Sequence, residues 1–151
     1  MNSYLVVVDE TGEADAALRY AARRAARSGG SVLILAIVPP QEFVQWGAVQ
    51  AAMEEEARLR AEAMGLQAAS ALDEAAAVQR TVLVRAGDPV KAITELLKER
   101  DDIRALVLAA AAEGGPGPLI AHFAGAVAAT LPSPLVIVPG RLTDEALDRL
   151  G

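Results

Sequence analysis

The sequence predicts an α/β fold in which helices cover both faces of a doubly wound, five-stranded parallel sheet. Two observations lead to this fold class. Short apolar runs rich in β-branched residues alternate along the chain with longer alanine-rich segments of helical periodicity. The apolar runs are continuous rather than alternating with polar residues, which indicates strands buried on both faces. Such strands need crossover connections, so the helices lie on both faces of the sheet.

The apolar runs and the helical segments give the predicted elements in order. The first two strands cover residues 4–8 and 31–38, and the third contains residues 82–84. The fourth and fifth strands cover residues 105–109 and 135–138. The helices between them cover residues 13–27, 48–76 with a break near Gly65, 90–100 and an Ala/Leu-rich segment after the fourth strand. Asp88 followed by Pro89 is typical of an N-cap and a first helical position.

Charge spacing supports the long second helix. Glu54 with Arg58, and Glu56 with Arg60, stand four residues apart and can form ion pairs on a helix surface. We therefore expect these two pairs along its exposed side.

The chain is long enough for one domain with a substantial core. We expect an α/β domain over residues 1–140 and a short helical tail over residues 141–151. Thr143 can cap a helix from Asp144 to Leu150 in this tail. The tail can pack on its own domain or reach across a dimer.

Composition excludes several classes of function. The net charge of −6 argues against nucleic-acid binding, which needs a basic surface. The absence of Cys and the single His argue against disulfides, thiolate metal sites and zinc. Asp9 and Glu10 interrupt the early apolar run, so we expect no signal peptide. We also expect no membrane association, and therefore a cytoplasmic protein.

The loop after the fourth strand, Glu113–Gly117, is the best candidate for a ligand site. A strand, a glycine-rich loop and a helix N-terminus can together hold an anion, because backbone N–H groups converge there. In parallel sheets, ligands bind at the carboxyl ends of the strands, where the strand order reverses. The same glycines can instead serve only to turn the chain.

Three segments in this order resemble the universal stress protein family over residues 4–139. These are Val6–Thr11, where an apolar strand leads to Asp9 and Thr11, then Gly87–Pro89, and Pro134–Pro139. The resemblance implies the adenine nucleotide alpha hydrolase-like fold with strand order 3-2-1-4-5. It also implies a homodimer, in which Leu135–Val138 pairs with its mate. That apolar run lies at a sheet edge, which agrees with such pairing.

The nucleotide-binding branch of the family has a Gly-x2-Gly-x9-Gly-Ser/Thr pattern after its fourth strand. On this chain the four key positions fall on Ala112, Gly115, Gly125 and Ala126. The resemblance implies that ATP is the ligand. It implies that Asp9 and the backbone of Ile37 meet the adenine. The resemblance further implies that the ribose and phosphates meet Gly115, Gly125 and the backbone amides of Ala126 and Val127. It also makes Thr11 an additional binding residue. A Mg²⁺ ion that bridges the phosphates and a carboxylate could offset the negative charge near the triphosphate.

Ala112 and Ala126 depart from this pattern. Ala112 adds a Cβ where close approach or a positive φ is needed, and Ala126 lacks the hydroxyl. Pro116 and Pro118 offer no N–H, and Glu113 adds negative charge. The departures predict weakened or lost affinity for the nucleotide. A dimeric interaction protein that binds no nucleotide is therefore the alternative.

The remaining candidates favour structural roles. A lone His122 on an apolar helix is most often structural, and Arg85 most often a solvated residue at a strand end. Phe43 and Trp46 can cover the mouth of the site or pack on a partner. No nucleophile–base pair is apparent, so an enzyme acting on a small phosphorylated substrate is the weakest reading, and ATP hydrolysis is expected to be slow or absent.

Overall fold

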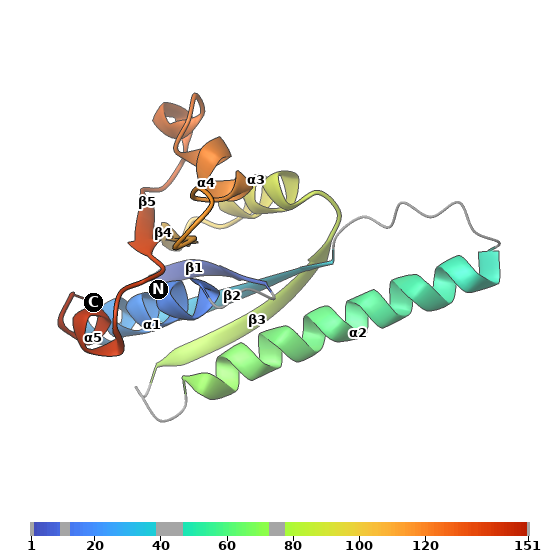
Figure 1. Cartoon of the computed structure of the whole chain (residues 1–151), viewed down its shortest axis with the longest axis horizontal. Coiled ribbons are helices and arrows are strands. Elements are labelled where there is room, and N and C mark those ends of the chain that lie inside the picture. The colour runs from blue at the N-terminus through green and yellow to red at the C-terminus, as the bar shows by residue number, and fades with distance from the viewer. Residues whose placement is uncertain (1, 10–12, 39–46, 73–77, 151) are drawn as a thin grey trace.

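The structure is a computed structural model, and it describes residues 2–9, 13–38, 47–72 and 78–150. The chain forms a single sheet with helices packed on its two faces (Figure 1). The strands are β1 (Ser3–Val8), β2 (Ser31–Val38), β3 (Gln79–Ala86), β4 (Ile103–Ala110) and β5 (Leu135–Pro139). All are parallel, in the order β3-β2-β1-β4-β5. The predicted fold class and strand order are confirmed.

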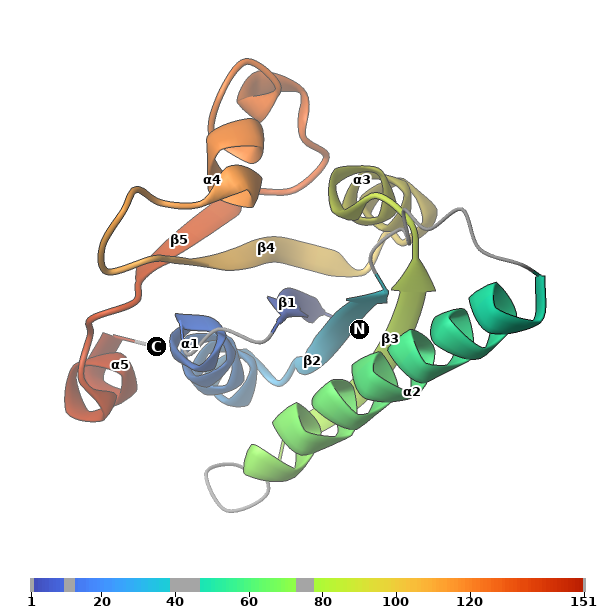
Figure 2. The ribbon, with the colours of Figure 1, turned by 45° about the vertical axis from the view of Figure 1, so that its right-hand side comes forward.

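The helices form two layers. They are α1 (Glu13–Ser28), α2 (Gly47–Ala71), α3 (Pro89–Glu99), α4 (Pro118–Phe123) and α5 (Asp144–Leu150), with a 3-10 turn η1 (Ala128–Thr130). One face of the sheet carries α1, α2 and α5, and the opposite face carries α3 and α4 (Figure 2). The sheet is therefore covered on both faces, as continuous apolar strands require.

Different side chains fill the two layers. Between the sheet and α1, α2 and α5, the buried strand residues are mostly Val, including Val6, Val32 and Val107, and the helices supply many Ala. On the face of α3 and α4, the buried residues are Leu, Ile and Phe, with Phe123 fully buried. We call these the alanine face and the leucine face.

The predicted break near Gly65 is wrong, because α2 runs without interruption from Gly47 to Ala71. Gly65 is buried, and a Cβ at this position would run into Cγ1 of Val82 on β3. The glycine therefore lets α2 approach β3 closely, and the surrounding good helix formers keep the helix intact. The predicted helix extended to residue 76, and residues 73–77 lie outside the described part.

Of the two predicted ion pairs on α2, one forms. Arg60 contacts Glu56 at 3.6 Å, whereas Arg58 turns the other way and contacts Glu62 at 3.1 Å. Glu54 accepts a hydrogen bond from Gln50 at 3.2 Å. Every one of these contacts has the i,i+4 spacing, and the Arg58–Glu62 pair forms although its acidic residue follows the basic one, which is the less favoured order on a helix.

The Ala/Leu-rich segment after β4 is not one helix. It divides into α4 and η1, with a turn over residues 124–127. Gly125 stands in the turn because a Cβ there would lie only 2.8 Å from the carbonyl oxygen of Ala121. The chain thus ends α4 after six residues and makes only one further 3-10 turn before β5.

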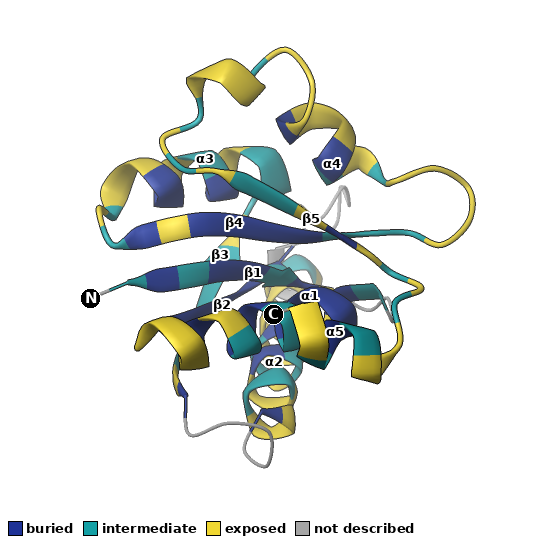
Figure 3. Cartoon of the chain, turned by 90° about the vertical axis from the view of Figure 1, so that its left-hand side faces the viewer, coloured by how far each residue is buried: buried dark blue, intermediate teal, exposed yellow. Residues whose placement is uncertain are grey.

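Both predicted caps are present. The Asp88 carboxylate accepts from the Lys91 amide at 3.0 Å, and the Thr143 hydroxyl from the Ala146 amide at 3.1 Å. The tail helix α5 packs against α1 of its own chain (Figure 3). Its Leu147 is buried in the same core cluster as the alanines of α1.

Candidate functional site

The carboxyl edge of the sheet brings together several of the residues predicted to bind a ligand. Val8 pairs with Ala36, so by extension of this register Asp9 and Ile37 stand at the same level on neighbouring strands. On its other side β1 pairs with β4, whose carboxyl end continues into the glycine-rich loop. The order of strands reverses between β1 and β4, which is where ligands bind in open parallel sheets.

The side chains at this edge differ in exposure. Asp9 is exposed, while Ile37 is half-buried and packs against the leucine face. Thr11 lies outside the described residues, as do Phe43 and Trp46. The ends of β1 and β2 therefore place the Asp9 carboxylate beside an apolar strand end.

The glycine-rich loop is shaped by backbone conformation. Gly114, Gly115 and Gly117 have φ values of +78°, +93° and +101°, a region that other residues rarely adopt. A Cβ on any of them would meet nothing within 4 Å. These glycines therefore serve the turn itself. Ala112 and Gly115 are both exposed, so each is open to a ligand.

The other three predicted residues, Gly125, Ala126 and Val127, lie in the turn between α4 and η1. Ala126 is exposed, and Val127 packs on the leucine face. Within the described part of the chain, neither of these two amides donates a backbone hydrogen bond. Both are available to an acceptor, but η1 has only three residues and contributes little helix dipole.

Negative charge predominates at this edge. Asp9 and Glu113 are exposed, and Glu13 begins α1 nearby. Arg141 follows β5 and contacts Glu113 at 3.2 Å, with both side chains largely in solvent. Such an exposed pair is weak, so Arg141 can leave Glu113 for a ligand anion at little cost.

The sequence did not indicate how β5 ends. The Gly140 amide donates to the Ala110 carbonyl at 2.9 Å. A Cβ at Gly140 would crowd that carbonyl oxygen and the side chain of Glu13. Gly140 therefore allows the ends of β4, β5 and α1 to meet, and so places Arg141 beside the loop.

Arg85 and His122 have contacts that suit structural roles. Arg85 contacts Glu99 on α3 at 3.2 Å. His122 is exposed, and its ring meets that of Phe123 edge-on, with centroids 4.9 Å apart.

The described residues contain no group of three or more His, Cys, Asp or Glu side chains that could hold a metal ion. Over the same residues, no helix combines the length and apolar character needed to cross a bilayer.

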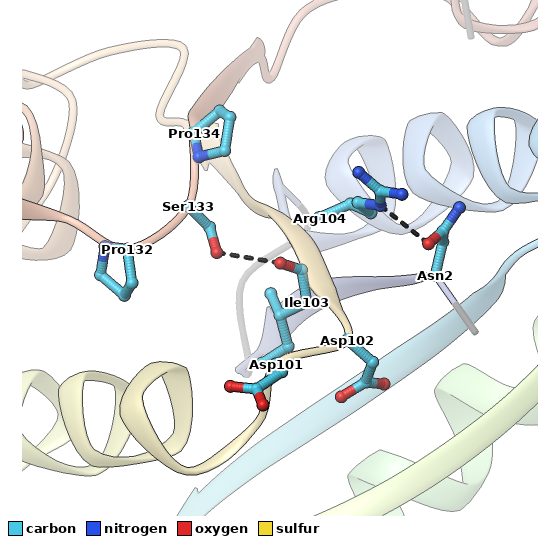
Figure 4. Close-up of a pocket in the computed structure, with 8 residues that line it drawn as sticks. All are labelled: Asn2, Asp101, Asp102, Ile103, Arg104, Pro132, Ser133 and Pro134. Carbon is cyan, nitrogen blue, oxygen red and sulfur yellow. Dashed lines mark hydrogen bonds between the residues drawn. The ribbon is translucent and has the colours of Figure 1, made fainter.

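A further cavity, which the sequence did not reveal, lies at the opposite, amino edge of the sheet (Figure 4). It measures about 610 Å³ and lies between the start of β4 and the segment that leads into β5. Asp102 in its wall accepts hydrogen bonds from Arg100 at 2.8 Å and from Ser3 at 2.6 Å. The guanidinium of Arg100, followed by the Ser3 hydroxyl, holds the pKa of Asp102 well below its usual range.

Several solved structures of universal stress proteins have the same architecture as this chain. The protein UspA from Lactobacillus plantarum has 19% sequence identity and a TM-score of 0.68, over 91% of this chain and 97% of that one. A universal stress protein from Archaeoglobus fulgidus in complex with dAMP has 18% identity and a TM-score of 0.66, over 91% and 98%. A universal stress protein in complex with cAMP has 21% identity and a TM-score of 0.63, over 91% and 96%. At these identities the matches show the fold.

Among curated proteins, none matches this chain. The model of the universal stress protein family, however, matches residues 1–139, which is most of the chain. Strand order, the turn at Gly87–Pro89 and the closing strand β5 agree with that match. This chain therefore belongs to the universal stress protein family.

Proposed function

We propose that this chain binds an adenine nucleotide, ATP, at the carboxyl edge of its sheet and acts in the cytoplasm as a nucleotide-responsive regulatory module of the stress response. The observation that carries the proposal is the switch point between β1 and β4, where Asp9 and the glycine-rich loop leave adjacent parallel strands. Two universal stress proteins of the same fold are described in complexes with cAMP and with dAMP.

The adenine end of the proposed site has suitable groups. Asp9 is exposed at the level of Ile37. Its carboxylate is an acceptor for the amino group of adenine, and the backbone of Ile37 offers a donor and an acceptor to the ring edge. Ile37 also supplies an apolar surface for a flat base.

The groups at the phosphate end of the proposed site are less favourable for binding, and they determine the affinity for ATP. The amides of Ala126 and Val127, together with Gly115, are the donors, while Glu113 and Asp9 repel a triphosphate. Mg²⁺ bound with the phosphates would offset this charge, and Arg141 can turn toward them. We propose that hydrolysis is slow or absent, because the glycine-rich loop contains no Lys or Arg to stabilise the transferred phosphoryl group, and Arg141 beside it is held only by an exposed ion pair.

Calorimetric titration of nucleotide-free protein with ATP, with and without Mg²⁺, tests the proposal. We expect micromolar affinity that improves with Mg²⁺. Absence of heat at millimolar ATP, at two temperatures that exclude an accidental zero enthalpy, would overturn it.

Three variants locate the site within the same titration. Asp9→Ala should weaken ATP binding about tenfold, since it removes a hydrogen bond to the base. Ala126→Ser and Ala112→Gly should strengthen binding, because they restore a hydroxyl and remove a Cβ. Ala129→Ser on the exposed side of η1 is the matched control. Gly125→Val is unsuitable, since a Cβ there lies 2.8 Å from the Ala121 carbonyl and would disturb the turn without any ligand.

A dimeric interaction protein without nucleotide is the second candidate. The short α4, which begins with Pro118 and runs only to Phe123, weakens the phosphate end. In addition β5 is an edge strand whose Ile137 is 42% exposed, and an apolar edge favours pairing with a second copy. Sedimentation should then show a dimer that Ile137→Lys dissociates, with no nucleotide recovered from the purified protein. Stoichiometric ATP in that preparation would exclude this candidate.

A further inference from the structure

A second cavity adjoins the one at the amino edge of the sheet. It measures about 290 Å³ and shares Asn2, Arg104 and Pro134 with its larger neighbour. The shared residues make the two cavities neighbours, and we call them together the groove, which extends from Asp101 to the flank of α1. At the α1 end the lining adds Tyr4, Tyr20 and Arg24.

Arg104 enters this groove because of a β-bulge. Ser3 pairs with Ile103, but the next residue of β1, Tyr4, pairs with Ala105. Arg104 is therefore the extra residue of β4, opposite no residue of β1. A bulge of this kind turns a side chain out of the regular alternation and is common beside binding sites. Figure 4 shows the guanidinium of Arg104 reaching toward Asn2, whose Oδ1 accepts from Nε at 2.8 Å.

The groove holds two guanidinium groups without carboxylate partners. Of the four arginines on α1, Arg19, Arg23 and Arg27 contact Asp148 of α5. The fourth, Arg24, has no ion pair with any described residue, and among the same residues the side chain of Arg104 donates a hydrogen bond to the neutral Asn2 and forms no ion pair. In a chain of net charge −6, two unneutralised guanidinium groups on one cavity favour an anion.

Aromatic and apolar groups line the rest of the smaller cavity. Tyr4 and Tyr20 are the only tyrosines of the chain. Both are half-buried, both pack against the alanine face, and both line this cavity with Ala105 and Val136. A concave surface with aromatic walls and a few polar groups suits a small molecule.

We propose that this groove binds a small aromatic molecule bearing one oxyanion, a phosphate monoester or a carboxylate. Arg24 and Arg104 hold the oxyanion, since the guanidinium fork matches the geometry of both groups. Tyr4 and Tyr20 contact the ring. The volume of about 290 Å³ admits a single ring, and Asp101 and Asp102 at the far end disfavour a second anionic group.

Backbone and arginine side-chain NMR shifts, measured as phenyl phosphate and benzoate are titrated into the full chain, test the proposal. Both probes should shift Tyr4, Tyr20, Arg24 and Arg104 with saturable millimolar affinity, and the tighter probe identifies the preferred oxyanion. Neutral benzyl alcohol should bind at least tenfold more weakly. Arg104→Gln and Arg24→Gln should each weaken the preferred probe about tenfold. Arg58→Gln, on the exposed side of α2, should have no effect.

Three outcomes would overturn this assignment: shifts confined to the carboxyl edge, equal binding of inorganic phosphate, or equal affinity in Arg104→Gln and the Arg58→Gln control. The spectrum of each variant reports its own folding, so loss of structure is distinguished from loss of binding. Saturation with ATP should leave the shifts unchanged if the two sites are separate. The titrations of phenyl phosphate and benzoate themselves contain no ATP, so their result does not depend on whether ATP binds at the carboxyl edge.

Discussion

The two layers of this molecule are built on different principles. On the alanine face, α1 presents Ala17, Ala21 and Ala25 to the valines of the sheet, and each of the three is at most 1% exposed. On the leucine face, α3 and α4 present larger side chains to the leucines of β1, β2 and β4. Small residues let a helix approach closely but add little buried area each, whereas large ones bury more area per residue.

This difference determines which kind of substitution destabilises each face. The leucine face should be sensitive to truncation, because each large side chain fills volume that nothing else can fill. The alanine face should be sensitive to enlargement, because no space is left between α1 and the sheet. Since α4 also carries the turn with Gly125–Val127, the packing of the leucine face bears directly on the proposed nucleotide site.

The largest expected effect is truncation of Phe123. This side chain is fully buried and anchors α4. Phe123→Ala should lower the free energy of unfolding by about 3–5 kcal/mol, measured by urea denaturation. His122→Ala, at the exposed neighbour, should cost less than about 1.5 kcal/mol, since it loses only the ring contact. Similar losses in the two variants would contradict the assigned role of Phe123.

Enlargement on the alanine face comes next. Ala21→Leu places three carbons more between α1 and the sheet, at a position that is 0% exposed. We expect a loss of about 1–3 kcal/mol in the same denaturation experiment. Ala26→Leu on the exposed side of the same helix should change stability by no more than about 0.5 kcal/mol. A stabilised Ala21→Leu protein would mean that the face is not closely packed.

The smallest effect concerns the ion pairs that hold α5 on the alanine face. Hydrogen bonds from Arg19, and then from Arg23, hold the pKa of Asp148 well below its usual range. Because the pKa is lower in the folded state, the unfolded chain binds more protons on acidification. The contribution is complete above the unfolded pKa of about 3.9 and is lost as the pH falls toward the folded value.

Asp148→Asn should therefore be less stable than the parent at pH 7, and the difference should shrink below about pH 4. Thermal unfolding of both proteins between pH 7 and pH 2.5 measures it. Glu145→Gln on the same helix has no ion pair among the described residues and is the control. A difference that stays constant down to pH 2.5 would argue against the ion pair as its source.

Much of the fold followed from the sequence because strand runs, caps and helix lengths are local. The residue types of the strands also distinguish the alanine face from the leucine face. In Leu5-Val6 and Leu106-Val107 the leucines face α3 and α4, and the valines face α1. The division of the Ala/Leu segment into α4 and η1 did not follow, because Ala favours helix throughout. The turn is marked only by Gly125, where a Cβ would lie too close to the Ala121 carbonyl oxygen.

The site was predictable in its location and less so in its contacts. Parallel strand order brings Asp9, Ile37 and the glycine-rich loop to one edge, as expected from the topology. The pairing of Arg141 with Glu113 and the role of Gly140 depend on where β5 ends relative to β4 and α1. No local sequence pattern indicates this position. The bulge at Arg104 is likewise a property of the register between β1 and β4.

The docking of α5 also controls the electrostatic character of the molecule. Asp148 engages Arg19 and Arg23 through its side chain and Arg27 through its carbonyl. A chain cleaved after Pro139 would leave these three cations without their partner, on the same helix as Arg24, which has no ion pair with any described residue. An acidic protein would then carry a local cationic stripe, and cation stripes attract polyanions. The short tail thus supplies the hydrogen-bond acceptors for three of the four arginines of α1.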